Sequence, residues 1–315
     1  MNMDNLIVST SPHIHRKESV SYIMWAVVIA LIPSGIAGVW IFGIGALWVM
    51  LAGVFSALLF EALICRLRGK KVSILDASAI LTGLLLSYNL PANVPLWLPV
   101  VGSFVAIAVA KQAFGGLGRN IFNPALVGRA FLLAAWPTYM TTFIKPYDSI
   151  TAATPLALLK EGKALNLGQM NLSYFDFLTG GRGGCIGEVC IVALLIGALY
   201  LWVRKIISLH APFAFITIVA LLSWIFSGEA LFKGDFIFAV LSGGLILGAF
   251  FMATDYVTTP LTAKGQFIFG LGCGLLTFVI RKWGGYPEGV SYSILIMNAF
   301  VPLIDRFVRP KRYSP

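Results

Sequence analysis

The fold class follows from residues 19–60, SVSYIMWAVVIALIPSGIAGVWIFGIGALWVMLAGVFSALLF, which contain no Asp, Glu, Lys or Arg. A second charge-free stretch covers residues 77–110. Each stretch is longer than the ~20 apolar residues that a helix needs to cross a bilayer. Of the 315 residues, 58% are hydrophobic and only 11% are charged, and the mean hydropathy is +0.88. Because soluble domains carry about 25% charged residues, the composition excludes a soluble enzyme and indicates a polytopic membrane protein.

A strongly apolar chain crosses lipid either as helices or as a closed barrel, because lipid offers no hydrogen-bond partners to an open backbone. The apolar runs lack the alternating pattern of barrel strands. The sequence therefore predicts an all-α polytopic membrane protein with about ten transmembrane helices. The predicted spans cover residues 21–39, 41–64, 75–91, 94–112, 120–138, 186–203, 211–227, 235–253, 266–281 and 290–307.

One long polar segment separates the first five predicted spans from the last five. The predicted parts are a cytoplasmic tail (1–20), a first five-helix half (21–138), an extracytoplasmic loop (139–184), a second five-helix half (185–307) and a cytoplasmic tail (308–315). An odd number of helices gives the two halves opposite orientations, which is the plan of an inverted repeat. Short similarities favour such a repeat: Leu81–Leu86 resembles Leu241–Leu247, and Lys111–Gly116 resembles Arg281–Gly285.

The distribution of positive charge predicts the orientation. The net charge is +10, but the basic residues lie at the ends of the apolar spans, so they indicate membrane topology rather than nucleic-acid binding. Fifteen of the 23 Lys and Arg residues fall on one side of the predicted spans and seven on the other. The positive-inside rule then places both termini in the cytoplasm and the 139–184 loop outside it, with Arg281 and Lys282 as local exceptions.

The predicted loop contains a cluster of small and hydroxyl residues, Tyr147-Asp-Ser-Ile-Thr-Ala-Ala-Thr-Pro155. One interpretation is a turn that starts a helix at Pro155, with Ser149 or Thr151 as its cap. The other is a covalent attachment site at Thr154, with small neighbours that let a bulky group approach. The spacing alone leaves both interpretations open.

The stretch Asp148-Ser-Ile-Thr-Ala-Ala-Thr154 resembles the flavinylation motif of the membrane subunits of Rnf and Na⁺-translocating NADH:quinone oxidoreductase complexes. Further landmarks of this family are resembled by Phe114–Ala125, by Phe251–Pro260, and by Pro287-Glu-Gly289 with Asn298 and Pro302–Asp305, so the resemblance covers nearly the whole chain. The chain's length and its short N-terminal extension resemble the D subunits of Rnf complexes more than the longer B subunits of the quinone reductases. Tyr256 departs from the family pattern, in which Pro often follows Ala-Thr-Asp.

The resemblance implies a subunit of an ion-translocating ferredoxin:NAD⁺ oxidoreductase in the cytoplasmic membrane of a bacterium or archaeon, without a complete active site of its own. It implies covalent FMN on Thr154, with Asp148, Thr151 and Ala153 as the other motif positions. The phosphodiester would be made outside the cytoplasm by a flavin transferase, and our topology places Thr154 on that side. The implied partners are the A, B, C, E and G subunits of an Rnf complex, including a second FMN-bearing subunit and iron–sulfur subunits; no nucleic acid is implied.

The resemblance also implies a second, non-covalent flavin, riboflavin, at Asn120 and Asn123. The alternative is that these two asparagines only cap the helix that Pro124 begins. Asp255 lies in a family landmark, and we expect a role in a cofactor site or an ion path. The Gly115-Gly-Leu-Gly118 run follows an apolar helix rather than a strand, so we reject a dinucleotide-binding loop.

Ionisable residues within a membrane are candidates for function, because burying a charge is costly. Arg129, Glu188 and Asp305 qualify, with pairing between Glu188 and Arg182 as the rival explanation for Glu188. The four cysteines are scattered without a Cys-x-x-Cys motif, and we predict buried thiols and no metal site.

Two other classes of function compete with the electron carrier. The first is a permease or channel of inverted-repeat type, in which Asp255 and the Asn123-Pro124 break line a substrate path. The second is a structural membrane scaffold in which Thr154 is an ordinary capping residue. Bound flavin would distinguish the electron carrier from both.

Overall fold

The structure, a computed structural model, describes residues 19–69, 76–144, 146, 151–161, 170, 172–228, 230–286 and 288–309, with the backbone alone at 151 and 152. The first half holds α1 (Val20–Phe42), α2 (Ile44–Leu67), α3 (Ser78–Tyr88), α4 (Trp97–Phe104), which continues as the π-helix η3 (Val105–Gln112), and α5 (Pro124–Ala135). The connecting segment holds α6 (Pro137–Thr141), β1 (Phe143–Ile144), β2 (Thr151–Ala152), α7 (Pro155–Lys160) and α8 (Tyr174–Thr179). The second half holds α9 (Ile191–Val203), α10 (His210–Phe226), α11 (Phe236–Leu241), α12 (Leu245–Leu247), the π-helix η5 (Gly248–Met252), α13 (Ala263–Trp283) and α14 (Val290–Phe307).

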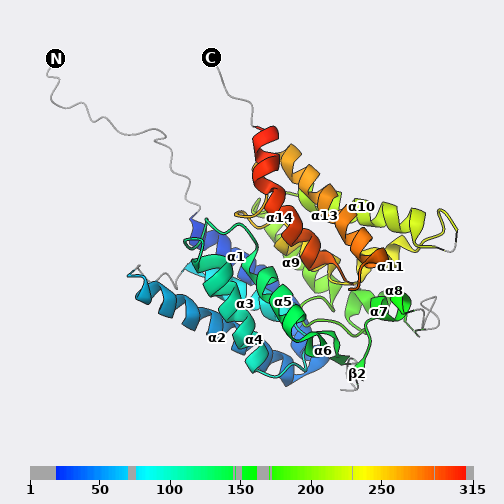
Figure 1. The fold of residues 1–315 in the computed structure, drawn as a ribbon. Helices are drawn as coiled ribbons and strands as arrows, with labels where there is room; N and C mark the ends of the chain where they lie inside the picture. The colour runs from blue at the N-terminus through cyan, green and yellow to red at the C-terminus, as the bar shows by residue number, and fades with distance from the viewer. Residues whose placement is uncertain are drawn as a thin grey trace, which may run out of the picture.

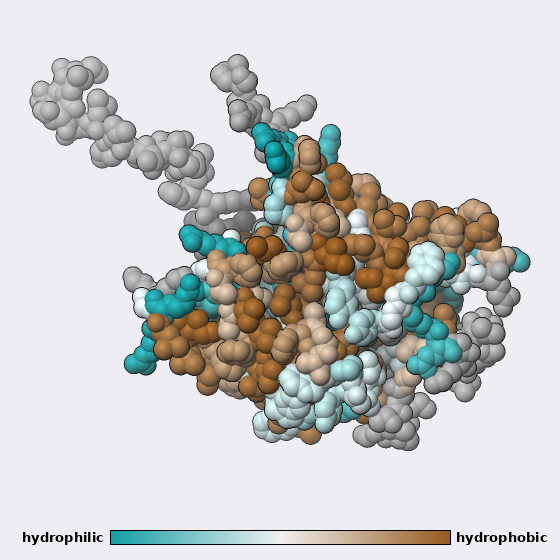
Figure 2. Space-filling view, in the orientation of Figure 1, coloured by the Kyte–Doolittle hydropathy of each residue, from teal (hydrophilic) through white to brown (hydrophobic). Residues whose placement is uncertain are grey.

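The described chain is a helical membrane protein, as the sequence predicts. Four helices, α1, α2, α13 and α14, are long and apolar enough to cross a bilayer, and five shorter apolar helices accompany them in the described part. The outer face of α1 is apolar as well as its inner face. The exposed residues on it follow helical spacing and lie opposite the buried ones: Trp25, Ile29, Ile32, Ile36 and Trp40. A helix that is apolar on all sides is expected where the surrounding medium is lipid. Apolar residues cover most of the face shown in Figure 2, and the surface over α6 to α8 is more hydrophilic.

Two predicted spans are shorter or more broken than the hydropathy pattern indicates. The 75–91 span contains a helix only from Ser78 to Tyr88, which begins directly after Ala77 in a left-handed conformation (φ +60°). The 235–253 span is divided into α11, α12 and η5, because Gly243 and Gly244 both adopt φ +66° between α11 and α12. Hydropathy does not detect the break at Gly243 and Gly244, since most of the residues around it are apolar.

Two further spans begin later than predicted. The 186–203 span becomes helical only at Ile191, because the backbone N–H groups of Ile186 and Gly187 donate to the carbonyls of Leu90 and Tyr88, at 3.0 Å each. A Cβ atom at Gly187 would lie 2.3 Å from the Tyr88 side chain, so only glycine permits this approach. The 120–138 span is helical from Pro124 to Ala135, with a separate short helix from Pro137.

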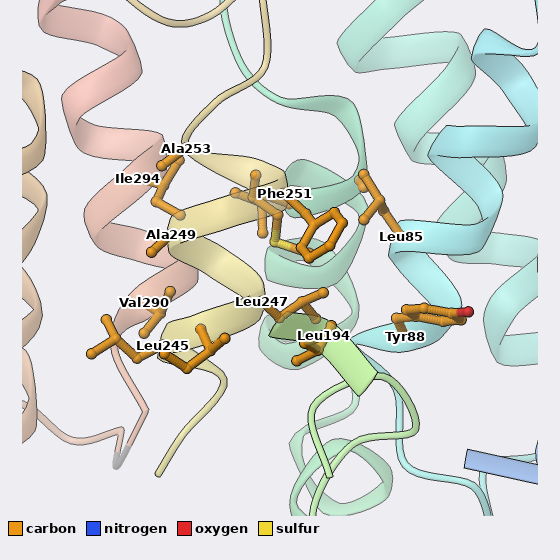
Figure 3. Packing of buried hydrophobic residues seen from close by; sticks show 14 of the residues in the cluster. Leu85, Tyr88, Leu194, Leu245, Leu247, Ala249, Phe251, Ala253, Val290 and Ile294 are labelled. Carbon is orange, nitrogen blue, oxygen red and sulfur yellow. The ribbon is translucent and has the colours of Figure 1, made fainter. Parts of the chain in front are cut away.

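The core lies between the two halves. Figure 3 shows Leu85 and Tyr88 of α3 facing Leu247 and Phe251 of α12 and η5, with Leu194 of α9 beside them. The Tyr88 hydroxyl donates to the Leu31 carbonyl of α1 at 2.7 Å. In addition, α1 packs against α9 and α5 packs against α14, so the halves form one body. The connecting elements α6, β2, α7 and α8 gather at one end of the bundle, opposite the C-terminal end of α14 (Figure 1).

Candidate functional site

Thr154 lies at the start of α7, directly after a two-residue β-ladder. Phe143 pairs with Ala152 and Ile144 with Thr151 in antiparallel register, which places Ala153 and Thr154 next to the end of α6. The Ala157 N–H donates to Thr154 Oγ1 at 3.2 Å, and Pro155 occupies the first helical position. Thr154 itself is therefore the cap, and the prediction that Ser149 or Thr151 caps this helix is wrong.

The other three motif positions differ in how far the structure describes them. Ala153 is exposed and offers no bulk beside Thr154. The backbone of Thr151 is in β2, but its side chain is outside the described residues, and so is Asp148. The described part of the motif is thus a small exposed residue followed by a capping hydroxyl.

Thr154 is 5% exposed and contributes to the wall of a pocket, which we call the Thr154 pocket. The pocket is lined by Arg129, Ala130, Leu133, Met140, Thr141, Phe143, Thr154, Ala157, Tyr286, Glu288, Gly289, Ser291 and Tyr292. Its walls come from α5, α6, β1, α7 and the start of α14, which are far apart in sequence. A group attached to the Thr154 hydroxyl would have a mainly apolar cavity beside it.

Lys160 fixes α7 to the second half. Its Nζ donates to the Ile280 carbonyl (3.3 Å), the Tyr286 carbonyl (3.0 Å) and the Gly284 carbonyl, all at or after the end of α13. A cation at a helix C-terminus satisfies carbonyls that have no partner within the helix. Partial burial lowers the pKa of the Lys160 ammonium group. The segment that carries Thr154 is therefore held against α13 by a charged side chain.

The remaining predicted residues meet in a second pocket, which we call the Asn120 pocket. Asn120, Asn123 and Asp255 all line it, together with Ser78, Lys111 and Tyr256, and its empty volume is ≈730 Å³. Asn123 caps α5 by accepting from the N–H groups of Ala125 (3.1 Å) and Leu126 (3.4 Å), so the capping interpretation is confirmed for Asn123. Its Nδ2 also donates to the Met252 carbonyl at 3.5 Å, which joins α5 to η5.

Asn120 is the polar group in this pocket that lacks a full set of partners. Its Nδ2 donates to the Phe122 carbonyl at 3.2 Å, but its Oδ1 is buried and accepts no hydrogen bond. Since buried polar atoms are normally paired, Oδ1 is free to accept from a ligand. Asp255 is oriented by the Thr258 hydroxyl (3.1 Å) and the Val257 N–H (3.4 Å). The capping interpretation of Asn120 is not supported by any hydrogen bond in the described residues.

Four charged side chains lie close together in the described chain: those of Arg129, Arg182, Glu188 and Glu288. Arg129 of α5 forms an ion pair with Glu288, which precedes α14. Glu188 accepts from the Cys185 N–H at 3.1 Å, and Arg182 donates to the Glu188 backbone carbonyl at 3.2 Å, so Arg182 contacts the backbone of Glu188. Cys185, Glu188 and Glu288 have potential ligand atoms within 4.8 Å of one another. We assign no metal to them, because the adjacent guanidinium groups of Arg129 and Arg182 already supply positive charge.

Two buried groups are found by the structure and not by the motif analysis. Glu288 lies within a family landmark, but nothing in the sequence identifies its partner. Lys111 Nζ donates to Glu61 Oε2 (2.9 Å) and Ser78 Oγ (2.7 Å), and Gln112 Nε2 donates to Glu61 Oε1 (2.7 Å). The lone Glu61 in an apolar run was the available signal for this second ion pair. Asp305, by contrast, is at the end of α14 and accepts from the exposed Leu261 N–H at 3.2 Å.

Comparison with known proteins identifies the family. Residues 7–314 match the family described as NQR2, RnfD, RnfE. The chain belongs to this family. It is 49% identical to the D subunit of the proton-translocating ferredoxin:NAD(+) oxidoreductase complex of Clostridium ljungdahlii, over 98% of this chain and 96% of the relative. It is 50% identical to the D subunit of the Na(+)-translocating ferredoxin:NAD(+) oxidoreductase complex of Acetobacterium woodii, over 100% of this chain and 97% of the relative.

The predicted likeness to the D subunits of Rnf complexes is confirmed. A more distant relative, the D subunit of the ion-translocating oxidoreductase complex of Salmonella newport, is 36% identical over 98% of both chains. Each pocket includes residues of segments that resemble family landmarks: Thr154 and Glu288 line the Thr154 pocket, and Asn120, Asn123 and Asp255 line the Asn120 pocket. Family membership does not test the cofactor assignments, which we treat below as proposals.

Proposed function

We propose that this chain is the D subunit of an Rnf-type complex that passes electrons between ferredoxin and NAD⁺ and couples this transfer to ion translocation. The observation that carries the proposal is the similarity, close to half of all positions over the full chain, to two D subunits of such complexes. One of these relatives is named as proton-translocating and the other as Na⁺-translocating, so we assign the class of ion only as Na⁺ or H⁺.

We further propose that Thr154 carries FMN as a phosphodiester. Three features support this assignment: the hydroxyl sits at the edge of the Thr154 pocket, its neighbour Ala153 is small, and Lys160 fixes the segment that bears it. When bound, the flavin supplies the electron transfer, while the protein supplies position and electrostatics. The chain needs no acid–base or nucleophilic residue of its own for this role.

The test is flavin fluorescence of the denatured protein in a gel, after co-expression with a flavin transferase. Denaturation removes non-covalent flavin, so only a covalent bond gives a fluorescent band. We expect a fluorescent wild type, a dark Thr154→Val variant and a fluorescent Thr179→Val variant. Thr179 is the matched control because it is an exposed threonine of the same connecting segment. A dark wild type, with the transferase active on another target, would contradict the assignment and favour a permease or a scaffold.

A non-covalent flavin in the Asn120 pocket is the second cofactor that we propose. The free Oδ1 of Asn120 and the nearby carboxylate of Asp255 can accept hydrogen bonds from the donor groups of a planar heterocycle such as riboflavin. The pocket lies between the two halves of the chain, since residues of both halves line it. Its lining is mainly apolar, which suits an aromatic ring.

We also propose that the two halves are inverted repeats. Helix packing supports this interpretation: α2 packs against α3 and α4, and α10 packs against α11 and α13 in the same order. In addition, the middle of α5 contacts the start of α14, and the middle of α14 contacts the start of α5. Arg129 of α5 donates to Ser291 Oγ of α14 at 2.5 Å, and the amide of Asn298 in α14, oriented to satisfy both its atoms, accepts from the Asn123 N–H at 3.1 Å. Such reciprocal contacts are expected about a twofold axis.

The proposed orientation, with both termini cytoplasmic and Thr154 outside, is tested with single cysteines. After replacement of the four native cysteines by serine, Ser173→Cys in the connecting segment and Lys205→Cys after α9 are compared in intact cells. Both positions are exposed at their ends of the bundle. We expect a membrane-impermeant maleimide to label the cysteine at 173 and to reach the one at 205 only after lysis. The reverse pattern would overturn the topology.

The partners that we propose are the other Rnf subunits, including flavin-bearing and iron–sulfur subunits, and a flavin transferase during maturation. The four cysteines Cys65, Cys185, Cys190 and Cys273 are free thiols that do not share one site. Iron–sulfur clusters are typically held by several thiolates together. Electrons that pass through clusters would therefore have to come from neighbouring subunits.

A further inference from the structure

A third pocket lies where α9 ends and α13 begins, and we call it the Lys205 pocket. Its solvent-accessible volume is ≈410 Å³, within the ~300–1,000 Å³ range of small-molecule sites. The Thr262 hydroxyl, just before α13, donates to the Val308 carbonyl just after α14 at 3.3 Å, so the pocket lies at the C-terminal end of α14. It is lined by Trp202, Lys205, Ile206, Ile207, Ser208, Ala211, Thr254, Tyr256, Thr259, Pro260, Leu261 and Gln266.

Lys205 occupies a backbone position that normally belongs to glycine. Its φ is +57°, and its N–H donates to the Trp202 carbonyl at 2.8 Å. The next N–H, of Ile206, donates to the Leu201 carbonyl at 2.9 Å, which completes a Schellman motif at the end of α9. A residue with a Cβ atom is strained in this left-handed conformation, and such strain is concentrated at functional sites. A lysine at this position therefore indicates that its side chain has a use.

The lining of the pocket carries a positive charge without a negative one. Among the described residues, the Lys205 ammonium group has no hydrogen-bond or ion-pair partner, and no Asp or Glu lines the pocket. The Asp255 carboxylate accepts from the Val257 N–H at 3.4 Å and lies outside the lining. The Asp305 carboxylate accepts from the Leu261 N–H at 3.2 Å and also lies outside it. The pocket therefore favours an anionic ligand.

Neutral side chains of the lining add a donor and fix the wall. The Ser208 hydroxyl donates to Gln266 Oε1, which leaves the Gln266 Nε2 group without a partner in the described part of the chain. The Tyr256 hydroxyl donates to the Ile206 carbonyl, a bond that the proline frequent at this position in the family could not make. An ammonium group and an amide N–H together suit the oxygens of a phosphate group.

An apolar row on the surface of α9 leads to the pocket. Leu195, Leu199 and Trp202 are exposed at helical spacing, and Trp202 is also part of the lining. Leu261, another residue of the lining, is 81% exposed. Tryptophan is enriched where membrane helices meet the headgroup region, so the pocket lies at the depth of lipid headgroups. A soluble anion would gain nothing from this row, whereas an acyl chain can pack along it.

We propose that the Lys205 pocket binds the headgroup of one anionic phospholipid, with Lys205 paired to a phosphate oxygen and the acyl chains along the row from Leu195 to Trp202. A zwitterionic headgroup is disfavoured, because the lining has no carboxylate for its ammonium group. Basic pockets between membrane helices on the cytoplasmic side are typical sites for anionic lipids, which agrees with the proposed orientation. The inference does not depend on the flavins.

The first test is native mass spectrometry of the full chain in an equimolar mixture of phosphatidylglycerol and phosphatidylcholine with the same acyl chains. We expect the wild type to retain phosphatidylglycerol preferentially, and Lys205→Gln to reduce this preference about five-fold, the factor for one cation near an anionic lipid. Lys264→Gln is the control, because Lys264 is exposed on the first turn of α13 but does not line the pocket. Equal retention of both lipids by the wild type, or an equal reduction in both variants, would overturn the proposal.

The second test separates lipid binding from the backbone effect of Lys205. Lys205→Gly removes the ammonium group and suits φ +57°, so the variant keeps the end of α9 intact. A ligand that binds the folded state raises the unfolding temperature. We expect added phosphatidylglycerol to raise that of the wild type by several degrees and that of Lys205→Gly by much less. An equal rise in both proteins would overturn the proposal, and so would an equal rise of the wild type with inorganic phosphate alone.

The third test asks whether a neighbouring subunit covers the pocket instead. A photoreactive amino acid replaces Leu261, which lines the pocket and is exposed, and the whole complex is irradiated in its native membrane. We expect adducts with phospholipid and no cross-link to another subunit. A cross-link to another subunit as the main product would overturn the proposal and assign this surface to a protein interface.

Discussion

Arg129 and Glu288 form a buried ion pair across the boundary between the two halves, although they are 159 positions apart in the sequence. Their side chains are only 10% and 13% exposed. Arg129 is on α5 of the first half, and Glu288 directly precedes α14 of the second. The pair therefore fastens the two halves together at the Thr154 pocket, which both residues line.

Removing one member of this pair leaves a buried charge without its partner. We expect Arg129→Met or Glu288→Met to destabilise the protein by about 3–5 kcal/mol. The double variant should be more stable than either single variant, because neither charge then remains unpaired. Thermal unfolding of the purified protein in detergent measures all three. A double variant that is less stable than both single variants would contradict this electrostatic explanation.

Gly83 lies where α3 packs closely against α2. A Cβ atom at Gly83 would lie 2.5 Å from the Gly53 carbonyl oxygen and 2.8 Å from Val54 Cα, both of which are backbone atoms. Small residues allow membrane helices to pack this closely. We expect Gly83→Ala to cost about 1–3 kcal/mol through overpacking. Gly285→Ala is the control, since nothing lies within 4 Å of its Cβ position, and it should unfold at the wild-type temperature.

Asn120 is expected to hold a non-covalent flavin through its free Oδ1. In Asn120→Leu, the yield of flavin released by acid from the purified protein should fall several-fold, while the covalent band in a gel stays unchanged. Thr254→Val is the matched control: Thr254 lines the same pocket, but its hydroxyl donates to the Phe250 carbonyl at 2.6 Å. Equal release from wild type and Asn120→Leu would rule out this role for Asn120.

The contact between α8 and α11 depends on the protonation of one tyrosine. The Tyr174 hydroxyl donates to Asp235 Oδ2 at 2.7 Å, and this hydrogen bond raises the pKa of Tyr174 from 10.0 to about 12. Because the folded-state pKa is the higher one, the stabilisation is complete below about pH 10 and is lost as the pH rises through about 12. Difference absorbance of tyrosinate between wild type and Tyr174→Phe should show this late titration. In Asp235→Asn the titration should move to lower pH; if it does not, the hydrogen bond is not the cause.

Much of the candidate site was accessible from the sequence. Thr154 was identified by its motif, and Asn120, Asn123 and Asp255 by their landmarks; the structure adds that the last three share one pocket. The sequence could not predict that these residues share a pocket. Asn123 and Met252, for example, are 129 positions apart and come into contact only because α5 packs beside η5. The cap of α7 is Thr154, which the sequence analysis considered only for a scaffold, whereas the turn interpretation named Ser149 or Thr151; all three are suitable caps, and only the backbone conformation distinguishes them.

The membrane class could be derived from the amino-acid sequence without any structure, because residues 19–60 and 77–110 have no charge and lipid tolerates little else. The same is true of the family, since the residues of its motifs are contiguous. The start of α3 after Ala77 and the break at Gly243 and Gly244 emerge only from the folded chain, since both depend on a left-handed backbone conformation. The partners of Arg129, Lys111 and Asn298 also emerge only there. In an apolar surrounding, such polar groups have no water to bind, so each must find its partner across the folded bundle, and hydropathy carries no information about which one.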